Sequence, residues 1–385
     1  MNRLELTGLT ARPAQVWGGV RLVPLVRAAP VEGLRLHREV YEGLGAGIVE
    51  LGSRDRYISY IPHGLVADWS GEDGRAPEAG RQSAAYGTQF GGGGGGTGGG
   101  APRAMSLPPV PHHRLAKRRP GDRLRFLPLH LALEGYLALH FGGPSTAWEE
   151  WSRTALRDGL SPRAEDAYLG RSVRGLADAL RIFEIHPGQC GVMVYVSDAL
   201  AAAFVVPHPD DYRLLHASLV EDLYGELVHQ YALYGAPVPE LPVRIGGEEH
   251  IRDLGELRAA ARAQERVWEE AHGTLFAREL LDSSYAFDQV YRMKSFTLWR
   301  FLPPFVRDTG GQHIGETITD HKGRVAYLKT FRLSDAQIRR GHLLRTVAGA
   351  DWRLDAAAAA LGSSREELVR RLRAAGFSAL LKGNV

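Results

Sequence analysis

The chain has 385 residues, of which 44% are hydrophobic and 24% are charged, and this composition excludes a wholly disordered protein. No apolar run reaches the roughly 18 residues of a membrane-spanning helix, and the N-terminus lacks the apolar stretch of a signal peptide. The single cysteine excludes an intramolecular disulfide and a Cys-rich metal site, and the formal net charge of +3 is too small to indicate a partner. We therefore expect a cytoplasmic globular protein of two or three domains, with no membrane contact.

The first 70 residues have the pattern of β-strands separated by turns. Residues 20–26 form a β-rich run, and residues 48–51 and 57–61 alternate in the manner of strands. The pattern then stops, and residues 91–100 are glycine at every position except Thr97. Such a tract cannot offset its ordering entropy, which predicts a mobile loop or linker at about residues 70–111.

Strand and helix patterns follow each other in the rest of the body. Residues 190–196 are typical of a buried strand, and residues 199–206 of its hairpin partner. Helices are predicted at 210–234 and 252–271, and Gly323 indicates a hairpin turn before a further strand. The fold class that these patterns predict is an α+β body over residues 1–330, interrupted by the Gly-rich loop.

The body offers no catalytic motif. Glu226 and His229 have the i, i+3 spacing of metal-carboxylate bundles, but the second such pair is missing. The segment that begins at His208 indicates a helix start with Asp210 or Asp211 as the N-cap. Cys190 lies among apolar strand residues, which favours a buried structural thiol. We therefore predict no catalytic residue, no metal and no cofactor, although an unrecognised enzyme stays open.

Basic charge is concentrated at the end of the chain. Residues 331–385 contain ten Lys and Arg and five Asp and Glu, a net charge of +5, which leaves −2 for residues 1–330. Ser334 or Asp335 can cap a first helix that Gly349 ends. Residues 354–361, with five consecutive alanines, predict a short second helix.

A third helix completes this segment. Ser363 and Ser364 can cap it, Leu368 and Leu372 form its inward stripe, and Gly376 stops it. Three short helices, with a tight Gly-containing turn between the last two, predict a C-terminal three-helix helix-turn-helix domain over residues 331–385.

This segment resembles the Fis-type helix-turn-helix, the C-terminal DNA-binding module of many bacterial enhancer-binding regulators. The similarity covers about residues 336–380. It is carried by Trp352, the run at 357–365, Leu368, Arg371, Leu372, Gly376 and Phe377.

The resemblance implies a transcriptional regulator or DNA-linked accessory protein that binds double-stranded DNA, usually as a homodimer. Ser364 and Arg365 stand at the N-terminus of the recognition helix, where Arg365 could contact guanine bidentately. Arg370, Arg371 and Arg373 could contact phosphates.

Two residues favour a different function for the same helices. Ser363 replaces the usual aliphatic residue of the turn, and Glu367 adds a negative charge near the DNA face. The alternative is a segment that docks a protein partner.

A second resemblance lies in the body, spread over about residues 15–235. It is carried by residues 33–51, 146–152, 191–204 and 227–231. These segments resemble a bacterial domain family named for its association with ADP-ribosylglycohydrolases and rhodanese-phosphatases (ARPP). This resemblance implies a role in bacterial ADP-ribose-linked or conflict-related systems and no known reaction. On this alternative the chain is a non-catalytic accessory or scaffold protein whose C-terminal helices bind a protein partner.

Overall fold

The computed structural model describes residues 2–36, 180–213, 216, 244–245, 248–293, 295–307 and 311–381. It also describes six short strands between residues 48 and 105. The predictions for Glu226 and His229, and for most of the helix at 210–234, lie outside these residues.

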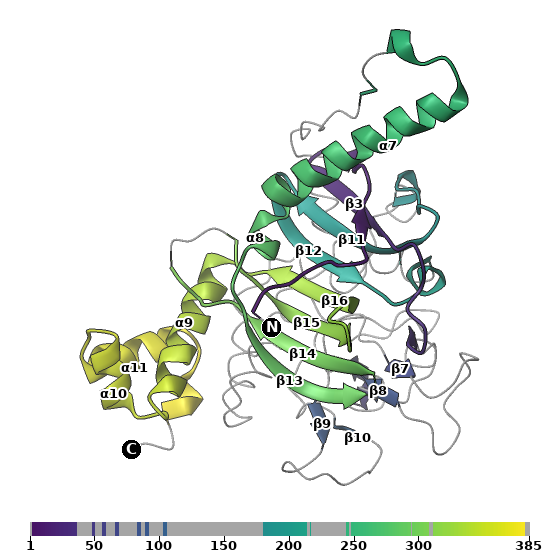
Figure 1. Ribbon diagram of the computed structural model, residues 1–385. Coiled ribbons are helices and arrows are strands. Elements are labelled where there is room, and N and C mark those ends of the chain that lie inside the picture. The colour runs from purple at the N-terminus through teal and green to yellow at the C-terminus, as the bar shows by residue number, and fades with distance from the viewer. Residues whose placement is uncertain are drawn as a thin grey trace.

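One antiparallel sheet organises the described residues, in the order β1-β3-β11-β12-β16-β15-β14-β13, and β2 pairs with β3 beside β1 (Figure 1). Its strands are β1 (Thr10–Ala11), β2 (Gln15–Trp17), β3 (Val20–Val26), β11 (Gln189–Val196), β12 (Ala199–Val205), β13 (Ala286–Met293), β14 (Phe296–Leu302), β15 (His313–Asp320) and β16 (Val325–Arg332). The pairing of β12 with β16 joins the N-terminal strands to the C-terminal meander.

The central strands are buried on both faces. Every residue of β3 is buried, as are the first seven residues of β11, β15 and β16. Strands buried on both sides contain continuous apolar runs, and this is why β3 and β11 could be recognised from the sequence. The predicted hairpin of 190–196 with 199–206 is confirmed as β11 and β12. Gly323, at φ +78°, lies in the predicted turn between β15 and β16.

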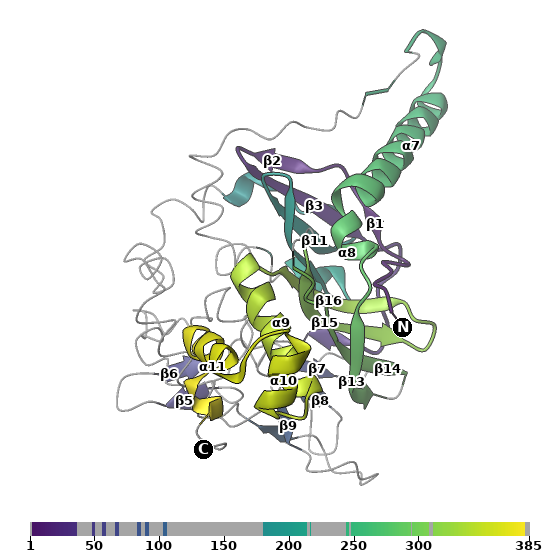
Figure 2. The same cartoon turned by 90° about the vertical axis from the view of Figure 1, so that its left-hand side faces the viewer.

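A helical segment crosses the sheet near β3 and β11 (Figure 1). It comprises α7 (Leu254–Ala271), a π-helical turn η3 (His272–Phe276) and α8 (Arg278–Leu281). Asp253 caps α7 by accepting a hydrogen bond of 2.8 Å from the backbone N–H of Glu256. The other end of α7 is fixed by Trp268, which is buried and stacks on His272. Figure 2 shows that the start of α7 extends beyond the sheet.

Three small sheets lie between residues 35 and 105. The first contains three strands, β4 (Arg35–Leu36), β7 (Val66–Asp68) and β8 (Ser83–Ala85). The second pairs β5 (Ile48–Glu50) with β6 (Arg56–Ile58), and the third pairs β9 (Gln89–Gly91) with β10 (Arg103–Met105). The pairing of β5 with β6 agrees with the alternation at 48–51 and 57–61. Strands β9 and β10 flank the glycine tract, of which residues 92–100 lie outside the described residues.

Three helices follow the sheet at the C-terminus, as the sequence predicts: α9 (Asp335–Gly349), α10 (Leu354–Ala360) and α11 (Arg365–Ala374), with a last turn η4 (Ser378–Leu381). Strand β16 continues to Arg332, so the helical segment begins at its cap, Ser334. Ser334 and Gln337 form a reciprocal capping box.

Helix α9 is attached to the sheet through the loop after β14. Phe305 is buried at φ +50°, and its ring lies against Gly341, where a Cβ atom would overlap it. Arg345 donates a hydrogen bond of 2.8 Å to the carbonyl of Pro304. The side chain of Gln312 fixes the same loop by donating to the carbonyl of Val306 and accepting from its N–H.

The predicted N-cap at Asp210 or Asp211 is wrong. The helix begins at Pro209, and the ring of His208 caps it, because His208 Nδ1 accepts a hydrogen bond of 3.1 Å from the N–H of Asp210. Cys190 is buried as predicted, and burial raises the pKa of its thiol although Arg27 acts to lower it.

Candidate functional site

The predicted DNA-binding residues lie on the exposed side of α11. Leu368 and Leu372 are fully buried on its opposite side. The turn from α10 to α11 passes through Gly362 at φ +59°, a conformation that glycine adopts readily. Ser364 ends this turn as the N-cap of α11, and its Oγ accepts a hydrogen bond of 3.2 Å from the N–H of Glu367.

Carboxylates on the same helices hold most of the predicted arginines. Arg365 lies 3.6 Å from Asp355 of α10. Glu367 binds both Arg370, at 2.6 Å, and Arg371, at 2.9 Å. These hydrogen bonds lower the pKa of Glu367, with the larger effect coming from Arg370.

Arg373, near the C-terminal end of α11, is exposed and forms no ion pair with the residues that the structure describes. The structure therefore brings the predicted residues onto one helix, but it pairs three of their four guanidinium groups with carboxylates.

Ser363 stands where the Fis-type turn usually has an aliphatic residue, and its surroundings suit an apolar side chain. Its hydroxyl oxygen is buried and has no hydrogen-bond partner. An aliphatic side chain would carry no such unpaired polar group. The turn is therefore formed with a residue that stabilises it poorly.

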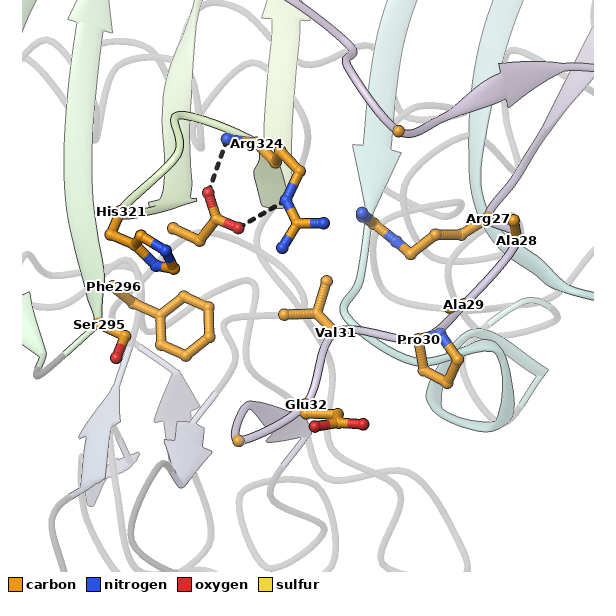
Figure 3. A pocket seen from close by; sticks show the side chains of 13 residues that line it. Arg27, Ala28, Ala29, Pro30, Val31, Glu32, Ser295, Phe296, His321 and Arg324 are labelled. Carbon is orange, nitrogen blue, oxygen red and sulfur yellow. Dashed lines mark hydrogen bonds and ion pairs between the residues drawn. The ribbon is translucent and has the colours of Figure 1, made fainter.

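A second region, which the sequence did not indicate, is a cavity of about 540 Å³ at the other end of the sheet (Figure 3). Its walls come from the loop after β3, the β13–β14 turn and the β15–β16 turn. Arg27 and Arg324 extend toward each other across it, and Phe296 and Val31 form an apolar wall.

The β15–β16 turn holds Arg324 in place. Asp320 accepts hydrogen bonds from the N–H groups of Lys322 and Arg324, both 2.9 Å long, and from Arg324 Nε at 2.7 Å. Burial acts to raise the pKa of Asp320, but the hydrogen bonds with Arg324 and Lys322 outweigh it and leave this pKa below its usual value.

A third polar feature crosses the half of the sheet that β13 to β16 form. The register places Asp288, Arg300, Glu316 and Lys329 side by side on β13, β14, β15 and β16, so that their charges alternate in sign. Glu316 and Lys329 are buried, and Tyr327 donates a hydrogen bond of 3.1 Å to Glu316. Burial lowers the pKa of Lys329, while the Glu316 carboxylate acts to raise it.

The sequence held one signal for this row of charges. Arg300 and Lys329 stand inside strands made mostly of apolar and aromatic residues, FTLWRFL and VAYLKTFR. Residues of this kind are rarely buried without a partner, so each indicates a neighbour of opposite charge. The cavity left no comparable signal, because Arg27 and Arg324 are 297 positions apart in the chain.

No group of three His, Cys, Asp or Glu among the described residues is arranged to hold a metal ion. None of the described helices combines the length and the apolar character needed to cross a membrane.

Comparison with known proteins confirms the resemblance of the body. A family model, ARPP-2, matches residues 4–294, which is more than half of the chain. The match ends between β13 and β14, so the rest of the sheet and the C-terminal helices lie beyond it. Searches of the curated proteins and of the solved structures found no match.

Proposed function

The chain belongs to the ARPP-2 family, and from this premise we propose that it is a cytoplasmic DNA-binding protein whose DNA reader lies beyond the family match. The reader is the segment α9–α11, in which α10 and α11 act as a Fis-like helix-turn-helix and α11 enters the major groove. The body then serves as sensor or scaffold of a bacterial regulator.

The observation that supports this proposal is the division of α11 into two faces. Leu368 and Leu372 fix one face in the core, while Arg370, Arg371 and Arg373 leave the other face basic and exposed. Ser364 caps the N-terminus of α11 and so orders the turn that carries Arg365. A recognition helix needs these same two faces.

The ion pairs on α11 do not prevent contact with phosphate. Exposed ion pairs contribute about 0–1 kcal/mol, so exchanging a carboxylate for a phosphate costs little. A bidentate contact between an arginine and guanine contributes about 1–3 kcal/mol to discrimination between bases. Arg365, at the N-terminal end of α11, is the residue that we assign to base contact.

A homodimer follows from the same geometry. One helix-turn-helix reads a single half-site, and dimers of such modules bind two half-sites about one helical turn apart. We therefore propose that two copies of this chain bind one operator.

The intramolecular ion pairs favour a second candidate function. Glu367 holds two arginines and Asp355 holds a third, so the surface of α11 is partly neutralised before any partner binds. A surface of alternating charges also suits a protein partner. On this reading the chain is a non-catalytic accessory protein of an ADP-ribose-linked or conflict-related system.

Fluorescence anisotropy with the full-length protein and a randomised duplex pool tests the first function, at low and physiological salt. Arg365→Ala should weaken binding to the selected sequence by about 1–3 kcal/mol and relax the base preference at one position. Arg370→Ala should weaken binding to all sequences alike and reduce the salt slope. Arg278→Ala, which removes an exposed arginine outside the segment α9–α11, is the matched control.

Glu367→Gln distinguishes the two functions. The change releases Arg370 and Arg371 without removing them, and Gln keeps the backbone bond to Ser364. A DNA reader should bind DNA severalfold more tightly and with a steeper salt dependence. No salt-sensitive DNA binding by the wild-type protein or by this variant would reject the DNA reader in favour of the protein-docking function.

A further inference from the structure

The cavity between Arg27 and Arg324 has the features of a ligand site. We propose that it binds a small molecule that carries one oxyanion group, a carboxylate or a phosphate, on an apolar body. The oxyanion lies between the two guanidinium groups, and the body lies against Phe296 and Val31 (Figure 3).

Arg27 is a buried cation that lacks an anionic partner. Its exposed fraction is 8%. One terminal nitrogen donates a hydrogen bond of 2.7 Å to the carbonyl of Val325, and its Nε is buried without a partner. No carboxylate within the described ranges pairs with it, although buried charges are normally paired. An oxyanion in the cavity would supply the missing counter-charge.

Arg324 faces Arg27 from a turn that fixes its direction. Its Nε donates to Asp320, and the Asp320 carboxylate accepts three hydrogen bonds in all from donors of its own turn. The terminal nitrogens of Arg324 therefore remain for a ligand, and Figure 3 shows them directed toward Arg27. Two facing cations repel each other, and an anion between them converts this repulsion into two charge-assisted contacts.

The other walls restrict what the ligand can carry. Phe296, which is 7% exposed, and Val31 line the cavity with apolar side chains, so this part of the cavity suits an apolar group. The carboxylate of Glu32 lies on the far side of Val31 from the two arginines (Figure 3). A second anionic group at that end of the ligand would be repelled, so we infer a single oxyanion.

This inference does not depend on DNA binding. The cavity lies where β3 and β15 end and β16 begins, whereas α9–α11 follow the other end of β16. The ligand test can therefore succeed while the DNA test fails, and the reverse also holds.

Isothermal titration of the full-length protein tests the site with phenyl phosphate and benzoate as probes and benzyl alcohol as their neutral counterpart. At least one anionic probe should bind, and the alcohol should bind at least about tenfold more weakly. Inorganic phosphate alone should bind more weakly than phenyl phosphate because it leaves the apolar wall uncovered.

Two exposed positions of one turn provide matched variants. Arg324→Gln should weaken binding of the anionic probe by about tenfold or more, because it removes one of two charged contacts. Lys322→Gln removes the same charge from a residue that does not line the cavity, and it should leave binding within about twofold. Phe296→Leu should weaken phenyl phosphate but leave inorganic phosphate unchanged.

Three results would overturn the proposal. They are no binding of either anionic probe at millimolar concentration, equal binding of benzyl alcohol, and equal losses in Arg324→Gln and Lys322→Gln. Circular dichroism and thermal unfolding of each variant establish that it is folded. Both substitutions in the turn affect side chains that are exposed, so we expect the fold to be retained.

Discussion

Two fully buried histidines differ in how their ring nitrogens are satisfied. His272 lies between Trp268 and Phe276, and a hydrogen bond of 2.8 Å joins its Nε2 to the hydroxyl of Tyr195. His313, at the start of β15, has both ring nitrogens buried without a partner. Burial, together with a smaller effect of a nearby arginine in each case, lowers the pKa of His272 to about 4 and that of His313 to about 3.

The pKa of His272 predicts a loss of stability in acid. The folded-state pKa of about 4 lies below the ordinary value of 6.5, so the neutral ring is favoured in the folded protein. The resulting stability is fully present above pH 6.5 and is lost as the pH falls toward 4. The loss amounts to about 3 kcal/mol at 1.36 kcal/mol per pKa unit. Urea unfolding at several pH values between 4 and 7 should show that the free energy of unfolding depends less on pH in His272→Phe than in the wild type.

His313→Leu should raise the free energy of unfolding at pH 7 by about 1–2 kcal/mol, because it removes two unsatisfied polar atoms and keeps a similar volume. His272→Leu is the matched control. It should destabilise the protein, since it leaves the buried hydroxyl of Tyr195 without its histidine partner. Denaturant unfolding measures both variants. Destabilisation by His313→Leu equal to that of His272→Leu would contradict the assignment of His313 as unsatisfied.

Helix α9 contains two glycines in opposite environments, which gives a test of its attachment to the sheet. A Cβ at Gly341 would overlap the ring of Phe305, whereas a Cβ at Gly349 meets no atom within 4 Å. Gly341→Ala should therefore destabilise the protein by about 1–3 kcal/mol. Gly349→Ala should be neutral or stabilising by up to about 1 kcal/mol, because alanine favours a helix. Thermal unfolding of the two variants should shift the midpoint in different directions.

Helix ends could be predicted from the sequence because their determinants are local. Ser334 and Ser364 each bind a backbone N–H three residues ahead, and both caps are confirmed. The cap at His208 shows the limit of this reasoning. N-cap preferences favour Asp210 or Asp211, but His208 is the N-cap residue, and its ring nitrogen accepts the capping hydrogen bond.

The pairing of distant strands and the cavity could not be predicted, because both depend on contacts between segments far apart in the chain. Strand β3 pairs with β11, and β12 with β16, across more than a hundred residues in each case. Arg27 and Arg324 meet only because this order brings their strand ends together. The alternation of charges from Asp288 to Lys329 likewise needs the register of the sheet, which periodicity within one strand does not reveal.

In the whole molecule, the sheet links two candidate sites at its opposite ends. Strand β16 begins next to the cavity, at Val325, and ends two residues before the cap of α9. The basic excess of residues 331–385 therefore lies at one end and the arginine cavity at the other. Removing the C-terminal segment at residue 330 would cut a central strand, so point variants test DNA binding more cleanly.

Truncations on either side of α9 should have different effects on stability. Deletion after Leu333 keeps β16 whole but removes α9, so it uncovers Phe305 and loses the buried side chains of Leu344 and Val347, all at most 2% exposed. We expect it to lower the free energy of unfolding by several kcal/mol, since each buried side chain of this size contributes about 1.5–3 kcal/mol. Deletion after Ala350 keeps α9 on the sheet and should cost less. Urea unfolding and binding of a hydrophobic dye should separate the two truncations, and equal losses would show that α10 and α11, rather than α9, stabilise the body.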